Sequence, residues 1–185
     1  MYIQPKAIQL TGGKTAILKS PELSDAAAVL ECMRLCAEQT HFLLRYPEEI
    51  ILGEEDEQKR LKQINEAADD FMLVAFIDGI LAGNAGVLSK NDCAKIRHRG
   101  EFGIGIKKEF WNIGLGTCML AEVLSTAEKT RFEQIELGVF ADNTRAKRLY
   151  EKAGFVQTGI IPRAYKLKDG TYRDEIQMIR MLNAT

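Results

Sequence analysis

Two glycines lie where a strand passes into a helix, in the segment "EFGIGIKKEFWNIGLGTCML" (residues 101–120). The backbone N–H groups at the start of a helix point outward without partners, and the helix dipole adds positive potential there. Because Gly114 and Gly116 carry no side chain, a phosphate can approach this backbone closely. The segment therefore indicates either an anion-binding loop or, more simply, close packing of the helix on the strand.

The common phosphate-loop patterns do not fit. In the Walker pattern G-x-x-x-x-G-K-[ST], "GKT" at residues 13–15 would need a glycine where Ile8 stands. The dinucleotide fingerprint G-x-G-x-x-G has Met119 at its third glycine, and the companion motifs of a kinase glycine loop are missing. These mismatches argue against a nucleoside triphosphate or a dinucleotide as the ligand.

A second segment, "NTRAKRLYEKAGF" (residues 143–155), follows after a short buried strand. Its apolar residues recur at helical spacing, and Gly154 stands where a helix C-terminal cap is expected. Together with "WNIGLGTCML", this segment resembles the GNAT superfamily of acyl-CoA-dependent N-acyltransferases. The family has [QR]-x-x-G-x-[GA] at the pyrophosphate loop, then a helix that starts at Asn and ends in Y-x-x-x-G-F. The matching residues of the second motif are Asn143, Tyr150, Gly154 and Phe155.

The resemblance extends, with decreasing specificity, over about residues 14–182. Trp111 departs from it, because the family usually has Gln or Arg at this place. A Trp is reminiscent of the ribosomal-protein and spermidine acetyltransferase branches. It removes one polar contact to the phosphates, and a ring packed under the loop is its simpler interpretation.

The resemblance implies acetyl-CoA as co-substrate and no metal. Its pantetheine arm would lie between two splayed parallel strands and pair with the backbone of Ile104 and Ile106. Asn143 and Arg145 would touch the cofactor from the next helix, although Asn143 is also a favoured N-cap residue. The pyrophosphate would rest on the amides of Ile113, Gly114, Leu115, Gly116 and Thr117.

The implied reaction is attack of a neutral amine on a thioester, which needs a base for the ammonium and an acid for the leaving thiolate. Tyr150 matches the family's general-acid tyrosine, with core packing as the alternative interpretation. Glu101 shares one face of its strand with Gly103 and Gly105 and is the candidate base. Its alternative is a strand-end glutamate in solvent.

The acceptor pocket of this fold is shaped by the first two helices with their loop and by the final hairpin. Acidic residues there suit a cationic amine, whereas arginines suit a carboxylate, and the sequence does not choose between them. The expected acceptor is the primary amine of a small molecule. The alternatives are a protein N-terminal or ribosomal-protein acetyltransferase and a non-catalytic acyl-CoA-binding module. The candidate substrate-binding residues are Phe42, Arg45, Tyr46 and Arg163.

The elements that hold these residues alternate along the chain, which predicts an α/β (α+β) architecture in one domain over residues 1–185. The resemblance implies a mixed central sheet of about seven strands flanked by about four helices, with splayed parallel strands at the cofactor site. Helices are expected from about Ser24, Glu54, Gly114 and Asn143. Strands are expected at 14–20, 71–89 (a hairpin turning at Asp78-Gly79), 101–107, 134–140 and in a final hairpin over 155–182.

Composition excludes several functions. The 25 Lys and Arg residues balance 26 Asp and Glu residues, so no overall field attracts nucleic acid or an acidic membrane. Four cysteines without a CxxC pair and two histidines show no metal-ligand spacing. The N-terminus lacks signal-peptide features, and the longest apolar run, at 71–77, is too short to span a bilayer. We therefore expect a cytoplasmic protein, with a homodimer through the exposed final strand left open.

Overall fold

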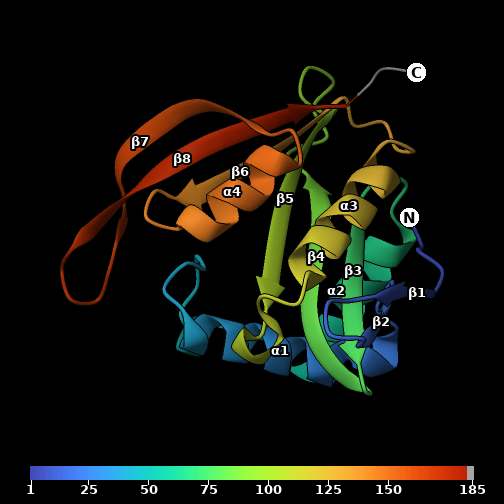
Figure 1. The fold of residues 1–185 in the computed structure, drawn as a ribbon. Helices are drawn as coiled ribbons and strands as arrows, with labels where there is room; N and C mark the ends of the chain where they lie inside the picture. Colours follow the sequence, from blue (N-terminus) through green and yellow to red (C-terminus); the bar gives the residue numbers. More distant parts are fainter. Residues whose placement is uncertain (183–185) are drawn as a thin grey trace.

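The central sheet is mixed and carries helices on both faces (Figure 1). In this computed structural model, which describes residues 1–182, the strand order is β1-β2-β3-β4-β5-β6-β8-β7. Within those residues every neighbouring pair is antiparallel except β5 and β6, which run parallel. The strands are β1 Lys6–Gln9, β2 Thr15–Lys19, β3 Phe71–Ile77, β4 Ile80–Ser89, β5 Arg99–Ile106, β6 Gln134–Phe140, β7 Val156–Lys166 and β8 Tyr172–Met181.

Over residues 1–182 the sheet has eight strands where about seven were expected, and the additional one is β1. Its residues pair with β2 in the register Lys6 with Leu18 and Gln9 with Thr15. Three of its four residues are exposed, so the segment has no alternation of apolar and polar residues to identify it. The other predicted strands are confirmed, including the hairpin that turns at Asp78-Gly79.

Within residues 1–182, four α-helices cover the sheet, and α1 and α2 lie on the opposite face from α3 and α4 (Figure 1). Strand β3 shows the division, because Leu73 and Ala75 pack in the core that includes α3, while Met72 and Val74 pack in the core that includes α1 and α2. The sheet is therefore buried on both faces at its centre. The helices are α1 Ala26–Gln39, α2 Glu54–Glu66, α3 Leu115–Ala127 and α4 Thr144–Lys152.

The parallel strands β5 and β6 separate after a short paired stretch, as the resemblance implied. They pair only where Arg99–Glu101 meets Gln134–Glu136. Beyond that point β5 continues beside β4, and β6 continues beside β8. The two strands therefore diverge toward their carboxyl ends and leave backbone groups of β5 facing an opening.

An ion-pair cluster holds the closed end of this opening. The carboxylate of Glu136 on β6 accepts hydrogen bonds from the Arg99 guanidinium on β5, at 2.7 Å for the Nη2 contact, and from Lys90 Nζ at 3.0 Å. The Arg99 contact, assisted by Lys90 and opposed by burial, lowers the pKa of Glu136 to about 2. The first paired residue of β5 and the last paired residue of β6 are thus joined by charge as well as by the sheet.

We expect the Glu136→Gln substitution to make the stability of the fold less sensitive to acid. A carboxyl whose pKa is lowered in the folded state stabilises it above its unfolded pKa, and this contribution is lost as pH falls from about 4.5 toward about 2. Urea unfolding at pH 6 and pH 3 should show a loss that is smaller by about 1 kcal/mol or more in the variant than in the wild type. The exposed Glu66→Gln should behave as wild type. Equal losses for Glu136→Gln and wild type would contradict the prediction.

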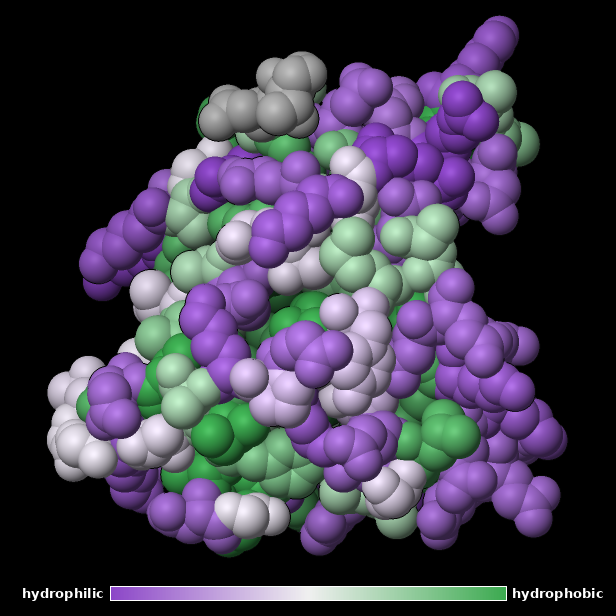
Figure 2. All heavy atoms as spheres, turned by 90° about the vertical axis from the view of Figure 1, so that its right-hand side faces the viewer, coloured by the Kyte–Doolittle hydropathy of each residue, from purple (hydrophilic) through white to green (hydrophobic). Residues whose placement is uncertain are grey.

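The last strand is not the edge of the sheet, contrary to the expectation of an exposed final strand. β8 lies between β6 and β7, so β7 forms that edge, and its exposed side chains include Val156 and Ile160. β1 forms the opposite edge, on the side of the molecule that Figure 2 shows, where apolar residues (green) lie among polar ones (purple). Within residues 1–182, no helix has both the length and the apolar character needed to cross a membrane.

Candidate active site

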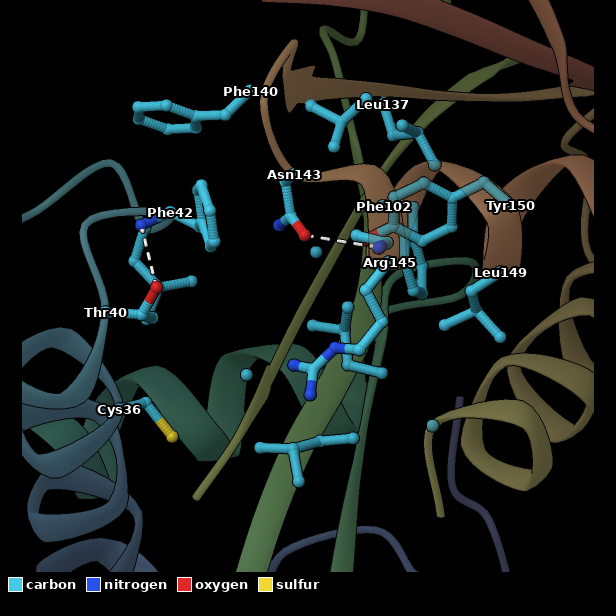
Figure 3. Close-up of a pocket in the computed structure, with 18 of the residues that line it drawn as sticks. Cys36, Thr40, Phe42, Phe102, Leu137, Phe140, Asn143, Arg145, Leu149 and Tyr150 are labelled. Atoms are coloured by element: carbon cyan, nitrogen blue, oxygen red, sulfur yellow. Dashed lines mark hydrogen bonds between the residues drawn. The ribbon is translucent and has the colours of Figure 1, made fainter. Parts of the chain in front are cut away.

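A cavity of about 780 Å³ opens where β5 and β6 separate. It is lined by both strands, the loop before α3, the first turn of α3, most of the length of α4, the segment after α1, and the final hairpin. Figure 3 shows Phe42 and Phe140 on one side, Tyr150 with Phe102 on the other, and the Arg145 side chain extending between them. The cavity therefore brings together most of the residues that the sequence singled out.

The glycine loop forms one wall of this cavity. Gly114 has φ +85°, a left-handed conformation that disfavours other residues, and α3 starts at the next residue. The first turn of α3 contains no acidic residue, and Gly114 has no side chain with which to cap the first N–H groups. Leu115, Gly116 and Thr117 line the cavity with Gly114, whereas Ile113 does not. The N-terminus of α3 is thus presented to the cavity as an anion-binding end.

The simpler packing interpretation is not required at Gly116. A Cβ atom at this position would lie 3.4 Å from Ile106 Cδ1 and 3.5 Å from Leu149 Cδ2, which is ordinary van der Waals contact. The space between α3, β5 and α4 would therefore accept a Cβ atom. Of the two glycines, Gly114 is the one that the backbone conformation requires.

Trp111 lies on this loop and contacts Arg145 rather than only filling space beneath it. The indole Nε1–H donates to the Ile106 carbonyl at 2.7 Å, which fixes the ring. Arg145 Cζ lies 3.6 Å from the centre of the indole ring, a cation–π contact. Burial lowers the pKa of Arg145 from its usual value. Trp111 thus stands where the resemblance implies a polar residue, and a cation from α4 lies against its ring.

The backbone of β5 directs alternate residues to opposite neighbours. Lys107 N–H donates to the Ala82 carbonyl on the β4 side. Because successive residues alternate, the backbone groups of Ile104 and Ile106 face the opening beside β6. The Ile106 carbonyl is occupied by Trp111, so Ile106 can offer a ligand its N–H and Ile104 can offer both groups.

The candidate acid and base lie on opposite faces of the sheet, on either side of the opening. Glu101 is paired with Glu136 across the strands and shares its face with Gly103 and Gly105, toward α1. Tyr150 on α4 packs edge-on against Phe102, whose side chain projects to the other face, with ring centres 6.0 Å apart. Both Glu101 and Tyr150 line the cavity. An acceptor approaching from the α1 side would therefore meet Glu101, and a group leaving toward α4 would meet Tyr150.

Tyr150 and Asn143 each keep the structural role that was the alternative interpretation. Tyr150 is 7% exposed and packs in the core, and this burial raises its pKa to about 12. Asn143 caps α4, since its Oδ1 accepts from the Ala146 N–H at 3.2 Å (Figure 3). Both also line the cavity, so the structural and functional roles coexist.

The four predicted substrate-binding residues separate in space. Phe42 lines the main cavity, and Arg45 lines a second, adjoining cavity of about 390 Å³ between the sheet and α1 and α2. Tyr46 and Arg163 line neither. The Tyr46 hydroxyl accepts from Lys168 N–H at 3.0 Å, and Arg163 lies over the Tyr172 ring at 4.0 Å.

One lining residue on the final hairpin, Glu175, was missed as a site residue. Tyr165 also lines the cavity; the sequence places it among the hairpin residues near the acceptor pocket, but not among the four candidate substrate-binding residues. Glu175 is paired with Phe140 across β8 and β6, so both project to the same face as Glu101. This placement depends on the register of strands that are distant in the sequence. The sequence carries no signal for that register beyond the alternation within each strand.

Comparison with known proteins agrees with this geometry. The model of the acetyltransferase (GNAT) family matches residues 36–155. The L-amino acid N-acetyltransferase AaaT of Escherichia coli is 32% identical over 110 residues, which cover 59% of this chain and 67% of that protein. A GNAT-family acetyltransferase from Streptococcus pneumoniae has a TM-score of 0.87 and 26% identity, covering 91% of this chain and 99% of its own. The fold is shared with yncA of Salmonella typhimurium, described as a putative acetyltransferase with its cofactor acetyl-CoA (TM-score 0.80, 18% identity, 92% and 95% coverage).

Proposed function

This chain belongs to the acetyltransferase (GNAT) family, and on that premise we propose that it transfers the acetyl group of acetyl-CoA to the primary amine of a small molecule. The observation that carries the proposal is the cavity at the splayed strands, with an open helix N-terminus at one wall and Glu101 and Tyr150 on opposite sides. The relative named as an L-amino acid N-acetyltransferase supports a small-molecule acceptor and an enzyme rather than a binding module.

The residues that line the cavity fit acetyl-CoA. The amides of Gly114, Leu115, Gly116 and Thr117 would bind the pyrophosphate, with Arg145 adding a positive charge. Backbone groups of Ile104 and Ile106 would pair with the pantetheine arm. Ile113, which does not line the cavity, would contribute through the loop conformation rather than by direct contact.

In the proposed reaction, Glu101 removes a proton from the acceptor ammonium, directly or through water. The neutral amine nitrogen then attacks the thioester carbonyl carbon, and the C–S bond breaks as the C–N bond forms. Tyr150 gives its proton to the departing thiolate, which leaves as CoA thiol, and the acylated nitrogen loses its extra proton, directly or through water, to the Tyr150 phenolate, which restores the tyrosine. With a pKa of about 12, Tyr150 stays protonated throughout the neutral range. The net reaction converts an ammonium and acetyl-CoA into an acetamide, CoA thiol and a proton.

A small acceptor is favoured over a protein N-terminus by contacts at the acceptor end. The loop after α1 and the final hairpin both line this end of the cavity, and Lys168 joins them through Tyr46 and an ion pair with Glu48. A protein substrate needs a wide open groove between these segments. Trp111 remains the one feature that favours the ribosomal-protein alternative.

Steady-state kinetics test the proposed direct transfer. CoA release is measured while acetyl-CoA and an amine are varied together, using amino acids, alkylamines, polyamines and short peptides. Direct attack in a ternary complex gives intersecting double-reciprocal lines, whereas a covalent acetyl-enzyme gives parallel lines. If CoA is released only when the acceptor is a peptide, the result would instead favour the protein N-terminal alternative.

Trp111→Ala should weaken acetyl-CoA binding because Arg145 loses the ring against which it is held. A cation–π contact of this kind corresponds to about a three- to thirtyfold change in affinity. Calorimetry measures the dissociation constant, and Trp111→Phe, which keeps a ring but not the N–H, should lose less. If Trp111→Ala binds acetyl-CoA as tightly as wild type, Arg145 does not depend on the indole.

A further inference from the structure

A carboxylate on the final hairpin projects into the acceptor side of the cavity. Glu175 lies on β8 opposite Phe140 and lines the cavity together with Tyr165 and Phe42. It lies on the same sheet face as Glu101. The acceptor side therefore presents two carboxylates and an aromatic wall.

Glu175 is held in place from two sides. The Tyr165 hydroxyl donates to Glu175 Oε1 at 2.5 Å, and the Tyr165 ring stacks on Phe140 at 3.9 Å with an interplanar angle of 10°. On the other side, Gly138 leaves room for the carboxylate, since a Cβ there would lie 2.0 Å from Glu175 Oε1. Any side chain at position 138 would displace this carboxylate.

The charge of Glu175 is not balanced within residues 1–182, where no Lys, Arg or His nitrogen lies within 4.0 Å of it. Other carboxylates around the opening are paired: Glu136 at its closed end with Arg99 and Lys90, and Asp142 beyond the end of β6 with Arg173. The basic residues that line the cavity are Arg145, Arg148 and Lys152, all on α4. Arg45 lines the adjoining cavity and not the one that contains Glu175. Among residues 1–182, the cavity that contains Glu175 thus has no basic side chain on its acceptor side, since His41, which lies against Phe42 and Phe140, contacts Asp142 and does not line this cavity. The same side has an unpaired carboxylate for an acceptor's ammonium.

We propose that Glu175 binds the acceptor's ammonium group, and that the preferred acceptor is an apolar or aromatic primary amine without a carboxylate beside the amine. The inference rests on the proposed function and narrows its substrate class, away from the amino acids in the name of the Escherichia coli relative. Tyr165 and Phe140 form the wall for the apolar body, and Tyr165 occupies one oxygen of Glu175 while the other stays available. An acceptor carboxylate in the same place would meet Glu101 and Glu175, both negative.

The matched probes are L-phenylalaninamide and L-phenylalanine, which differ in the charge of one group. For each protein, the kcat/KM for the amide is divided by the kcat/KM for the acid. Because the two amines differ in basicity, the quantity of interest is this amide-to-acid ratio in wild type divided by the same ratio in Glu175→Gln. We expect wild type to prefer the amide, and this quotient to be about ten or more, because a hydrogen bond to a charged group is lost. The loss should appear mainly in the KM for the amide.

Three variants separate binding from a structural role. Glu175→Asp should retain the preference for the amide, and Gly138→Ala, which keeps the charge but displaces the carboxylate, should reduce it. Glu66→Gln makes the same chemical change on the exposed surface of α2 and should have the same amide-to-acid ratio of kcat/KM as wild type. The dissociation constant of acetyl-CoA should be the same in wild type and Glu175→Gln, which also confirms that the variant is folded.

The outcomes distinguish this inference from the proposed function. Preference of wild type for L-phenylalanine, or a quotient near one, would overturn the role of Glu175 while acetyl transfer itself stands. If wild type binds acetyl-CoA and acetylates neither probe but acetylates other amines, the substrate class is wrong and the proposed function stands. If it neither binds acetyl-CoA nor acetylates any amine of the panel, both fail.

Discussion

Tyr150→Phe is expected to lower kcat about 100-fold or more while leaving acetyl-CoA binding unchanged. The hydroxyl would protonate the departing thiolate, a contribution typical of general acid catalysis. The ring would keep its contacts with Phe102 and Phe155, so the variant loses one oxygen and little packing. Within residues 1–182 this hydroxyl has no hydrogen-bond partner, and no structural hydrogen bond is broken.

Pre-steady-state measurement of CoA release isolates this effect from product dissociation. Tyr2→Phe, which removes a hydroxyl from an exposed tyrosine, is the matched control and should keep full activity. Because the pKa of Tyr150 is about 12, the wild-type rate should show no loss below pH 10 from ionisation of this residue. Unchanged kcat in Tyr150→Phe would mean that another group or water protonates the thiolate.

Gly114→Glu should weaken the affinity for acetyl-CoA by about 100-fold or more. The new carboxylate would lie at the N-terminus of α3, where the pyrophosphate is proposed to bind, and would repel it. Because Gly114 has φ +85°, any other residue at this position would also strain the backbone of the loop.

Gly170→Glu controls for both strain and charge. Gly170 has φ +84°, and a Cβ there would meet nothing within 4 Å, in the turn between β7 and β8. This variant should bind acetyl-CoA as wild type does. Equal binding by wild type and Gly114→Glu, both folded by circular dichroism, would contradict the proposed pyrophosphate site.

The parts of the fold that could be predicted are those with strong local chemistry. Asn143 and Gly154 are a cap and a left-handed residue whose types follow from backbone geometry, and α4 lies between them. The splay of β5 and β6 was implied by the resemblance and is confirmed. In contrast, β1 carries no apolar alternation and becomes a strand because β2 offers it an edge.

The site shows the same division between local and distant effects. The glycine loop and the position of Tyr150 follow from motifs within short segments. Glu175 enters the cavity because β8 pairs with β6 in one register, and the Ile106 carbonyl is occupied because Trp111 folds back onto it. Arg163 could serve a carboxylate by residue type, yet it lies on Tyr172 at the hairpin because the local backbone directs it there.

The most direct test of acetyl transfer uses acetyl-CoA labelled with ¹³C in the acetyl group. The protein is incubated with this donor and the amine panel, and mass spectrometry follows the label while a thiol reagent counts the CoA released. We expect the label to appear in an N-acetylated small amine, with one CoA thiol for each product molecule. With Tyr150→Phe, both the labelled product and the CoA thiol should form much more slowly than with wild type. Tight binding of acetyl-CoA without labelled product from any amine or peptide, or CoA release matched by free acetate, would contradict the proposed function.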